Sequence, residues 1–220
     1  MSVSLKKKKL FDYPIIFDHK PVVQAILNHL PLISCLSLLR TYPINISSID
    51  LATQRVREYL LLYTKSEPMS VVFSTVNGCS LTGGFILSVL VGDPWWIAEN
   101  YISDVDIACS EAAMHIIRQV IDAKRITRTS DYTGCECITD IYNFRLKKNN
   151  NRIFQIIAIS SSVDEYIETF DLSVCMNYFT GDKLVIKDPE SILKRVLVST
   201  KPPTEKRQER IEKYTRRGFK

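Results

Sequence analysis

Two aspartates separated by a single residue, Asp104 and Asp106, are the best candidates in this chain for chemistry. They lie in Ser-Asp-Val-Asp-Ile (residues 103–107), whose alternation predicts a strand with both carboxylates on one face and Val105 and Ile107 in the core. Such carboxylates are about 6 to 7 Å apart along the strand. They can share Mg²⁺ or Mn²⁺, whose charge relieves their mutual repulsion. The alternative is a solvated strand edge, because Asp-x-Asp also occurs by chance.

A glycine pair, Gly83-Gly84, stands between a predicted short strand and a predicted apolar helix over 84–91. Glycines let backbone amides approach a phosphate, and a helix N-terminus favours an anion. A glycine pair alone is usually only a turn. Together with the paired aspartates it predicts a phosphate cradle facing a metal site, with Thr82 and Ser103 as further cofactor-binding candidates.

A glycine pair that opens a helix, followed by a strand with the pattern Asp-h-Asp-h, resembles the signature of the DNA polymerase β-type nucleotidyltransferase superfamily. The resemblance covers residues 81–107. It implies that Asp104 and Asp106 bind two Mg²⁺ ions and that Thr82, Gly83 and Gly84 hold the triphosphate of a nucleoside triphosphate (NTP). The implied reaction is attack of a hydroxyl on the α-phosphorus with release of pyrophosphate.

Two further similarities lie towards the C-terminus. The layout of Phe170–Cys175, Gly181, 184–186, Asp188-Pro189 and 192–193 is similar to the region after the catalytic sheet in tRNA nucleotidyltransferase-like enzymes. The closing residues 210–219 are loosely similar to small members of this fold encoded by large DNA viruses. The spacing between Gly84 and Asp104 is longer than the superfamily's usual one, which predicts an inserted loop carrying Trp95 and Trp96.

A third carboxylate, which many active members carry on a neighbouring strand, has no obvious counterpart here. The matching strand is predicted over 152–159, and Gln155 occupies the expected position. A glutamine amide cannot act as a base at neutral pH. Asp171 is the nearest substitute. The site is therefore predicted either to rely on two aspartates or to survive as a binding module.

Basic residues recur at helical spacing near the C-terminus, at Arg207, Arg210, Lys213 and Arg217. One side of a terminal helix would thereby contact nucleic-acid or triphosphate phosphates. The alternative is an ordinary solvated helix face, since glutamates are interleaved. The lysines of residues 6–9 are equally open to nucleic-acid contact, nuclear import or a solubilising role.

The elements that must position these residues indicate an α+β nucleotidyltransferase fold, a mixed sheet flanked by helices with a helical N-terminal region and C-terminal helices. Strands are predicted at about 70–76, just before Gly83, and over 104–109, 125–128, 137–146, 152–159, 172–179 and 184–187. Helices are predicted over 21–30, 31–39, 51–63, 84–91, 111–123, 163–169, 189–196 and 204–217. The expected divisions are a basic flexible arm (1–10), a helical region (11–66), the core (67–200) and a basic helix (201–220).

Composition narrows the class of protein. The chain has 220 residues, 45% hydrophobic and 24% charged, which is typical of a globular domain. No apolar run suits a bilayer, and the first residues do not read as a secretory signal. Six scattered cysteines favour a reducing, intracellular setting, cytoplasmic or nuclear, or a viral factory or virion if the protein is virus-encoded. The spacing in Cys135-Glu136-Cys137 does not suit a zinc half-site.

The sequence thus predicts a Mg²⁺-dependent (or Mn²⁺-dependent) transfer of a nucleoside monophosphate from an NTP to a hydroxyl of a nucleic acid, protein or small molecule, with no membrane partner. Two alternatives stay open. One is a non-catalytic module of the same fold that binds nucleic acid or a protein partner through its basic ends. The other is a toxin-like or antitoxin-like nucleotidyltransferase that modifies another protein.

Overall fold

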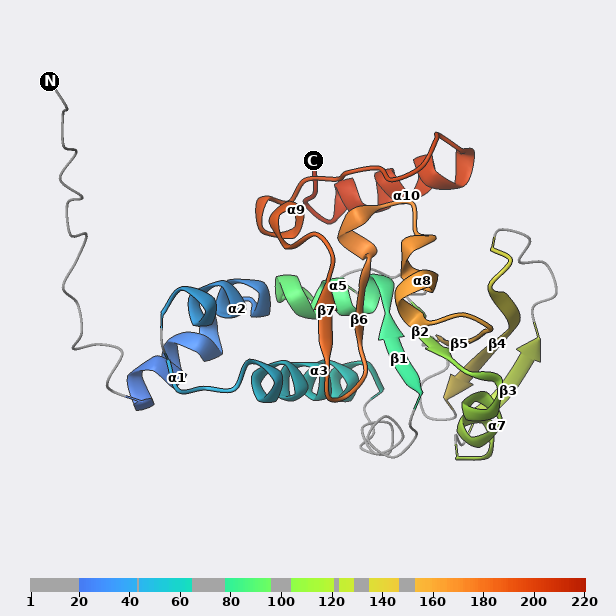
Figure 1. Cartoon of the computed structure of the whole chain (residues 1–220), viewed down its shortest axis with the longest axis horizontal. Helices are drawn as coiled ribbons and strands as arrows, with labels where there is room; N and C mark the ends of the chain where they lie inside the picture. Colours follow the sequence, from blue (N-terminus) through green and yellow to red (C-terminus); the bar gives the residue numbers. More distant parts are fainter. Residues whose placement is uncertain are drawn as a thin grey trace, which may run out of the picture.

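The computed structural model describes residues 20–42, 44–64, 78–95, 104–120, 123–128, 135–146 and 153–220. Its N-terminal part is helical, with α1 (Lys20–His29), α2 (Leu32–Thr41) and α3 (Ser48–Thr64) gathered beside the sheet (Figure 1). Pro31 precedes α2 and suits a helix start, because proline lacks the N–H that a first turn leaves unpaired. Predicted helices over 21–30, 31–39 and 51–63 are therefore confirmed, with shifted ends.

A seven-stranded mixed sheet forms the centre, in the order β3-β4-β5-β2-β1-β6-β7. Its strands are β1 (Cys79–Thr82), β2 (Asp104–Cys109), β3 (Ala123–Arg128), β4 (Ile138–Leu146), β5 (Ile153–Ile159), β6 (Asn177–Phe179) and β7 (Leu184–Ile186). Only β2 and β5 run parallel; the other neighbouring pairs are antiparallel. The predicted α+β class, a mixed sheet flanked by helices, is confirmed.

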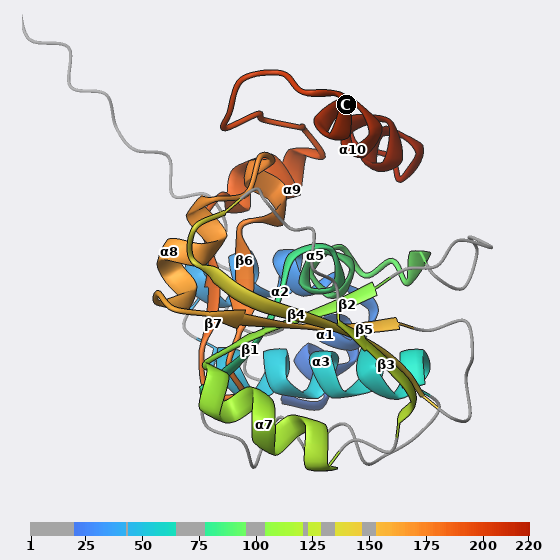
Figure 2. The same ribbon diagram turned by 90° about the vertical axis from the view of Figure 1, so that its right-hand side faces the viewer.

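The two faces of the sheet differ in character. One face is apolar and includes Val105 and Ile107, both fully buried in the core that α3, α5 (Gly83–Val91) and α7 (Glu111–Val120) share. The other face carries Asp104 and Asp106, and its smaller apolar cluster packs against α8 (Val163–Glu168). Figure 2 views the sheet nearly edge-on, with α3 and α7 on one side and α8 on the other. The predicted alternation of β2 is thus confirmed.

Helix α5 begins immediately after β1 and is almost wholly buried. Gly83 makes the turn between them with φ +65°, a conformation that residues with a Cβ rarely adopt. Gly92 ends the helix with φ +73°, and its N–H bonds back to Val89. The direction of α5 is therefore set by a glycine at each end.

The C-terminal part returns over the sheet as α8, a 3₁₀ turn η1 (Ser173–Cys175), α9 (Pro189–Lys194) and α10 (Glu205–Arg216). Ser162 and Glu165 form a capping box at α8, and the Thr204 side chain caps α10. The Lys220 backbone bonds to Leu197 at 2.7 Å and to Arg195 at 2.8 Å. These bonds fasten the segment after α10 to the segment after α9, as Figure 1 shows at the C-terminus.

Two predicted elements differ from the structure, and a third is not tested by it. The predicted strand over 172–179 is mostly wrong, because the Ser173 hydroxyl donates to Asp188 at 2.6 Å and the chain turns there; only residues 177–179 are extended. The predicted helix over 111–123 ends at Val120, and β3 already begins at Ala123. The predicted strand over 70–76 lies outside the described residues.

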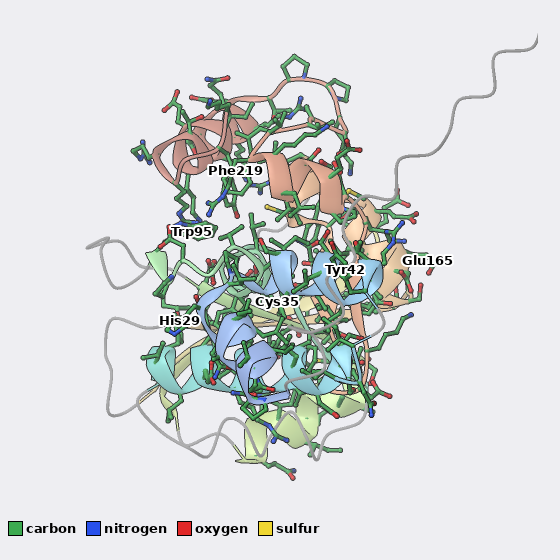
Figure 3. The ribbon with its side chains drawn as sticks, turned by 90° about the vertical axis from the view of Figure 1, so that its left-hand side faces the viewer. His29, Cys35, Tyr42, Trp95, Glu165 and Phe219 are labelled. Carbon is green, nitrogen blue, oxygen red and sulfur yellow. A yellow bond between two sulfur atoms is a disulfide. The ribbon has the colours of Figure 1, made fainter. Side chains whose placement is uncertain are left out.

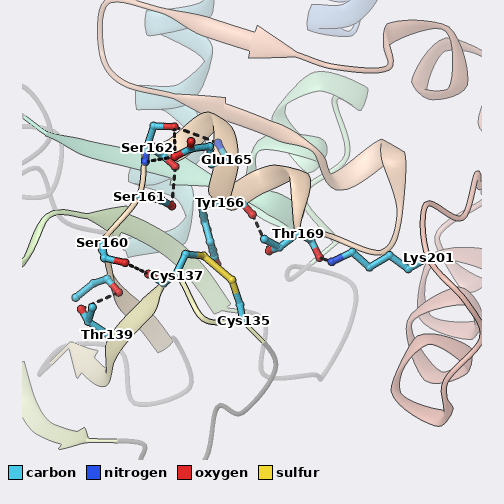
Figure 4. The surroundings of a disulfide bond; sticks show 11 residues. Cys135, Cys137, Thr139, Ser160, Ser161, Ser162, Glu165, Tyr166, Thr169 and Lys201 are labelled. Carbon is cyan, nitrogen blue, oxygen red and sulfur yellow. Dashed lines mark hydrogen bonds between the residues drawn. A yellow bond between two sulfur atoms is a disulfide. The ribbon is translucent and has the colours of Figure 1, made fainter.

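Cys135 and Cys137 are joined by a disulfide, a bond that the sequence analysis did not foresee (Figure 4). The bond lies just before β4, where the Cys137 carbonyl accepts from the Ser160 N–H at 2.9 Å. The other cysteines in the described residues, at positions 35, 79, 109 and 175, are buried free thiols.

Candidate active site

A cavity of about 310 Å³ opens on the polar face of the sheet, between the start of β2, the start of α5 and helix α10. Its lining brings together residues that are far apart in the sequence. They are Gly83, Gly84, Asp104, Asp106, Gln155, Ile157, Tyr166, Phe170, Asp171, Cys175, Arg210, Lys213, Tyr214 and Arg217. Most of the residues predicted for a phosphate and metal site therefore share one cavity.

The side chains of Asp104 and Asp106 are only partly exposed to solvent, and their negative charges repel each other. Burial raises the pKa of Asp106 well above its ordinary value of 3.8, and the nearby Asp104 raises it further. Lys213 and Arg210 act in the opposite direction but do not cancel the effect. The site therefore disfavours a second negative charge at Asp106 unless a cation is present.

Replacing Asp106 with asparagine is expected to stabilise the metal-free protein at neutral pH. A carboxyl whose pKa is raised by folding binds more protons in the folded state, so stability falls as pH rises from 3.8 through the raised pKa. The neutral amide escapes this loss. Thermal unfolding without Mg²⁺ from pH 4 to pH 8 should show the Asp106→Asn advantage growing with pH, whereas parallel curves for the two proteins would contradict it.

The glycine pair lies directly against the aspartates and α10. A Cβ on Gly83 would come within 3.3 Å of Asp106 Oδ2 and 3.6 Å of the Phe170 ring. A Cβ on Gly84 would lie only 2.8 Å from Tyr214 Oη. The absence of a side chain at Gly83 and at Gly84 thus lets these neighbouring side chains approach the backbone closely. The backbone at the start of α5 faces the cavity.

Gln155 lies beside Asp106, its register partner on the parallel strand β5. Its side-chain amide donates to Asn143 Oδ1 on β4 at 2.8 Å. The position on the neighbouring strand where a third carboxylate was expected is therefore occupied by Gln155, whose amide is hydrogen-bonded to Asn143.

Asp171 lines the same cavity, although it follows α8 rather than lying in a strand. Its Oδ2 forms an ion pair with Arg210 Nη1 at 2.7 Å, and its side chain is only 16% exposed. The predicted substitute carboxylate thus reaches the cavity, but it is engaged by a cation from α10.

Helix α10 directs part of its basic side into the cavity. Arg210, Lys213 and Arg217 all line it, and the Arg217 guanidinium also lies 4.6 Å from the centre of the Trp95 ring. Arg207, by contrast, is buried outside the lining and donates to Ser199 Oγ at 2.7 Å. Three of the four predicted phosphate-contacting residues are therefore grouped, and Arg207 is not one of them.

An aromatic cluster holds α10 in this position. Trp95 packs edge-on against Tyr214 and Phe219, with ring centres 6.2 and 6.4 Å apart, and Arg195 covers Phe219. Figure 3 shows Trp95 and Phe219 approaching each other below α10. Of the two roles considered for Trp95, base stacking or an aromatic plug, its 5% exposure favours packing.

The donor set suits Mg²⁺ better than a metal that needs a full protein cage. Among the residues that the structure describes, no group of three or more His, Cys, Asp or Glu side chains gathers to hold a metal. Mg²⁺ commonly binds through one or two carboxylates, with substrate phosphates and water completing its shell. Asp104 and Asp106, next to a cavity lined by three basic side chains, fit that arrangement.

The remaining predicted residues are placed as follows. Thr82 is fully buried at the end of β1 and does not line the cavity; its hydroxyl has no hydrogen-bond partner among the described atoms. Ser103, Trp96 and the lysines of residues 6–9 lie outside the described residues. Sequence reasoning missed Tyr214, although its position four residues after Arg210 on the same helix face could have revealed it.

A larger cavity, of about 620 Å³, opens at the opposite ends of β2 and β5. Its walls are mostly apolar, with Val56, Leu60 and Phe179 among them, and Arg57 and Asp182 at its rim. None of the aspartates or glycines of the smaller cavity contributes to it. The larger cavity is therefore separate from the candidate active site.

Fold and site together define an α+β protein with a two-aspartate, glycine-turn cavity closed by a basic helix. The chain belongs to the Gabija anti-defense 2 family, whose model matches residues 51–194. No curated protein matches it. Every helix in the described ranges is too short or too polar to cross a membrane.

Solved structures with some similarity are CCA-adding enzymes. One is a complex with CTP, at 11% identity and a TM-score of 0.45, covering 64% of this chain and 36% of the other. Another is the Thermotoga maritima enzyme complexed with tRNA, at 12% identity and a TM-score of 0.46, covering 66% and 36%. The chain thus spans about a third of the length of these matched chains.

Proposed function

We propose that this protein is a Mg²⁺-dependent nucleotidyltransferase that moves a nucleoside monophosphate from an NTP to a hydroxyl acceptor. The observation that carries the proposal is the shared cavity of Asp104, Asp106 and the glycine pair beneath Arg210 and Lys213. A carboxylate pair from β2 and basic side chains from α10 in the lining of one cavity match the charge distribution of a metal-bound triphosphate.

Each group has a distinct task in this proposal. Asp104 and Asp106 would hold Mg²⁺, which neutralises charge on the reacting phosphates when bound. The backbone amides at Gly83 and Gly84 would bind phosphate oxygens at the start of α5. Arg210 and Lys213 would offset the charge that develops on the departing pyrophosphate.

The description of the family suggests the biological context of the proposed reaction. It names an anti-defense activity directed at Gabija, and we propose that the acceptor of the nucleotidyl group is a component of that defense. This choice agrees with the surface of α10. Its exposed charged residues are three acidic and three basic, namely Glu205, Glu209, Glu212, Lys206, Arg210 and Arg216. Such a balanced surface suits a protein partner better than a nucleic-acid backbone.

The test is incubation with each α-labelled NTP, Mg²⁺ or Mn²⁺ and a panel of acceptors that includes purified Gabija components and tRNA. Label transfer with stoichiometric pyrophosphate release, abolished by a chelator, is expected for one acceptor. Transfer that persists in the Asp104→Ala, Asp106→Ala double variant would rule out the proposed site. Label found on a nucleic acid alone would overturn the choice of a protein acceptor.

A second candidate function is a non-catalytic module that binds a protein partner. The observation that favours it is Gln155, an amide at the register position beside Asp106. The double aspartate variant separates the two candidates. A binding module retains its activity against the defense without the aspartates, whereas an enzyme loses it while staying folded.

A further inference from the structure

Tyr214 contributes a buried hydroxyl to the candidate active site. Its ring is held from behind by Trp95 and Phe219, at 6.2 and 6.1 Å between ring centres. Its Oη reaches the first turn of α5, where it lies 2.8 Å from the position of a Cβ on Gly84. The ring is thus fixed by packing, while the hydroxyl alone projects to the phosphate cradle.

The hydroxyl has only a weak partner in this state. It lies beside the thiol of Cys175, which also lines the cavity. A thiol is a poor hydrogen-bond partner compared with a phosphate oxygen. Burial raises the pKa of Tyr214 well above its ordinary value, so the group remains a neutral O–H donor.

The neighbours of this hydroxyl identify the kind of ligand it would meet. Gly84 lies at the helix N-terminus, and Lys213 and Arg210 line the same cavity from α10. The negative charge of Asp104 also acts on Tyr214. On the α5 and α10 sides, however, the amides, cations and O–H group are all donors or positive charges, a set that complements a polyanion. The aspartates, on the β2 side, would hold the metal beside the reacting phosphate.

We propose that Tyr214 is a binding residue for the pyrophosphate portion of the triphosphate, to which its hydroxyl donates a hydrogen bond at Gly84. This assignment rests on the proposed function, because it presumes a Mg²⁺-bound triphosphate in this cavity. It predicts that Tyr214 discriminates between ligands by the phosphates beyond the α-position. A nucleoside monophosphate would not reach it.

The experiment is calorimetric titration of the full chain with inorganic tripolyphosphate and, separately, with AMP, each in Mg²⁺. Tyr214→Phe is expected to weaken tripolyphosphate binding about tenfold, as loss of a hydrogen bond to a charged group implies, and to leave AMP binding within about twofold. Tyr178→Phe is the matched control, because its buried hydroxyl bonds Asp164 at 2.8 Å outside the cavity. It should bind both ligands like the wild type.

A Tyr214→Phe protein that binds tripolyphosphate as tightly as wild type, or that loses AMP equally, overturns the assignment. So does wild-type protein that fails to bind tripolyphosphate. Tripolyphosphate binding that depends on Tyr214 without any label transfer would support Tyr214 while the proposed transferase function fails.

Discussion

Replacing Asp104 and Asp106 together with alanine is expected to lower kcat/KM for nucleotidyl transfer by at least about a thousandfold. Their carboxylates would hold the Mg²⁺ that offsets phosphate charge, a contribution of about 4 kcal/mol or more to transition-state stabilisation. Each single asparagine variant is expected to lose nearly as much as the double variant, because two ligands of one metal act as a unit.

The measurement is initial-rate pyrophosphate release at several NTP concentrations. Asp182→Ala is the matched control, since this exposed acid lies in the β6–β7 turn at the other, larger cavity. It should leave the rate unchanged. If the fold-losses of the two single variants multiply to give the fold-loss of the double variant, the two aspartates act independently. That result would argue against a shared metal.

Replacing Gly84 with alanine is expected to destabilise the protein by about 1–3 kcal/mol, the usual cost of overpacking. The new methyl would lie 2.8 Å from the hydroxyl oxygen of Tyr214, whereas the nearest atom of the ring itself, Cζ, would be 4.0 Å away. In the Tyr214→Phe background the hydroxyl is gone and the clash disappears. Alanine should then be tolerated, and its higher helix propensity, worth up to about 1 kcal/mol over glycine, favours it there.

A double-mutant cycle by urea unfolding tests this coupling. The expected outcome is a destabilised Gly84→Ala protein whose stability recovers when Tyr214→Phe is added. Tripolyphosphate binding should stay weak in the double variant, because the hydroxyl is absent. Additive free energies of unfolding would mean that Tyr214 and Gly84 do not touch in solution.

Short-range patterns were sufficient to predict the aspartate and glycine half of the candidate site. Alternation placed Asp104 and Asp106 on one face, and the resemblance to nucleotidyltransferases indicated Gln155 on a neighbouring strand, which the structure identifies as β5. The placement of the aspartates uses the period-two geometry of a strand, which depends on neighbouring residues alone. The start of α5 at Gly83 was predictable for the same reason.

The other half depends on contacts between distant parts of the chain. Nothing local indicates that Arg210 pairs with Asp171, that Arg207 turns inward to Ser199, or that Tyr214 reaches Gly84. Basic residues at three- and four-residue spacing define a helix side but not what it faces. Residues 172–176 misled the prediction because a side-chain bond from Ser173 to Asp188 overrides their extended propensity.

The docking of α10 bears on how the protein is made. The basic side of the cavity comes from α10 and Arg217, whereas the glycine turn and the aspartates precede them in the chain and are synthesised earlier. Because the ribosome synthesises a chain from its N-terminus, a nascent chain would contain its two acidic side chains before their cationic counterpart on α10. The cavity would therefore be complete only once α10 has left the ribosome.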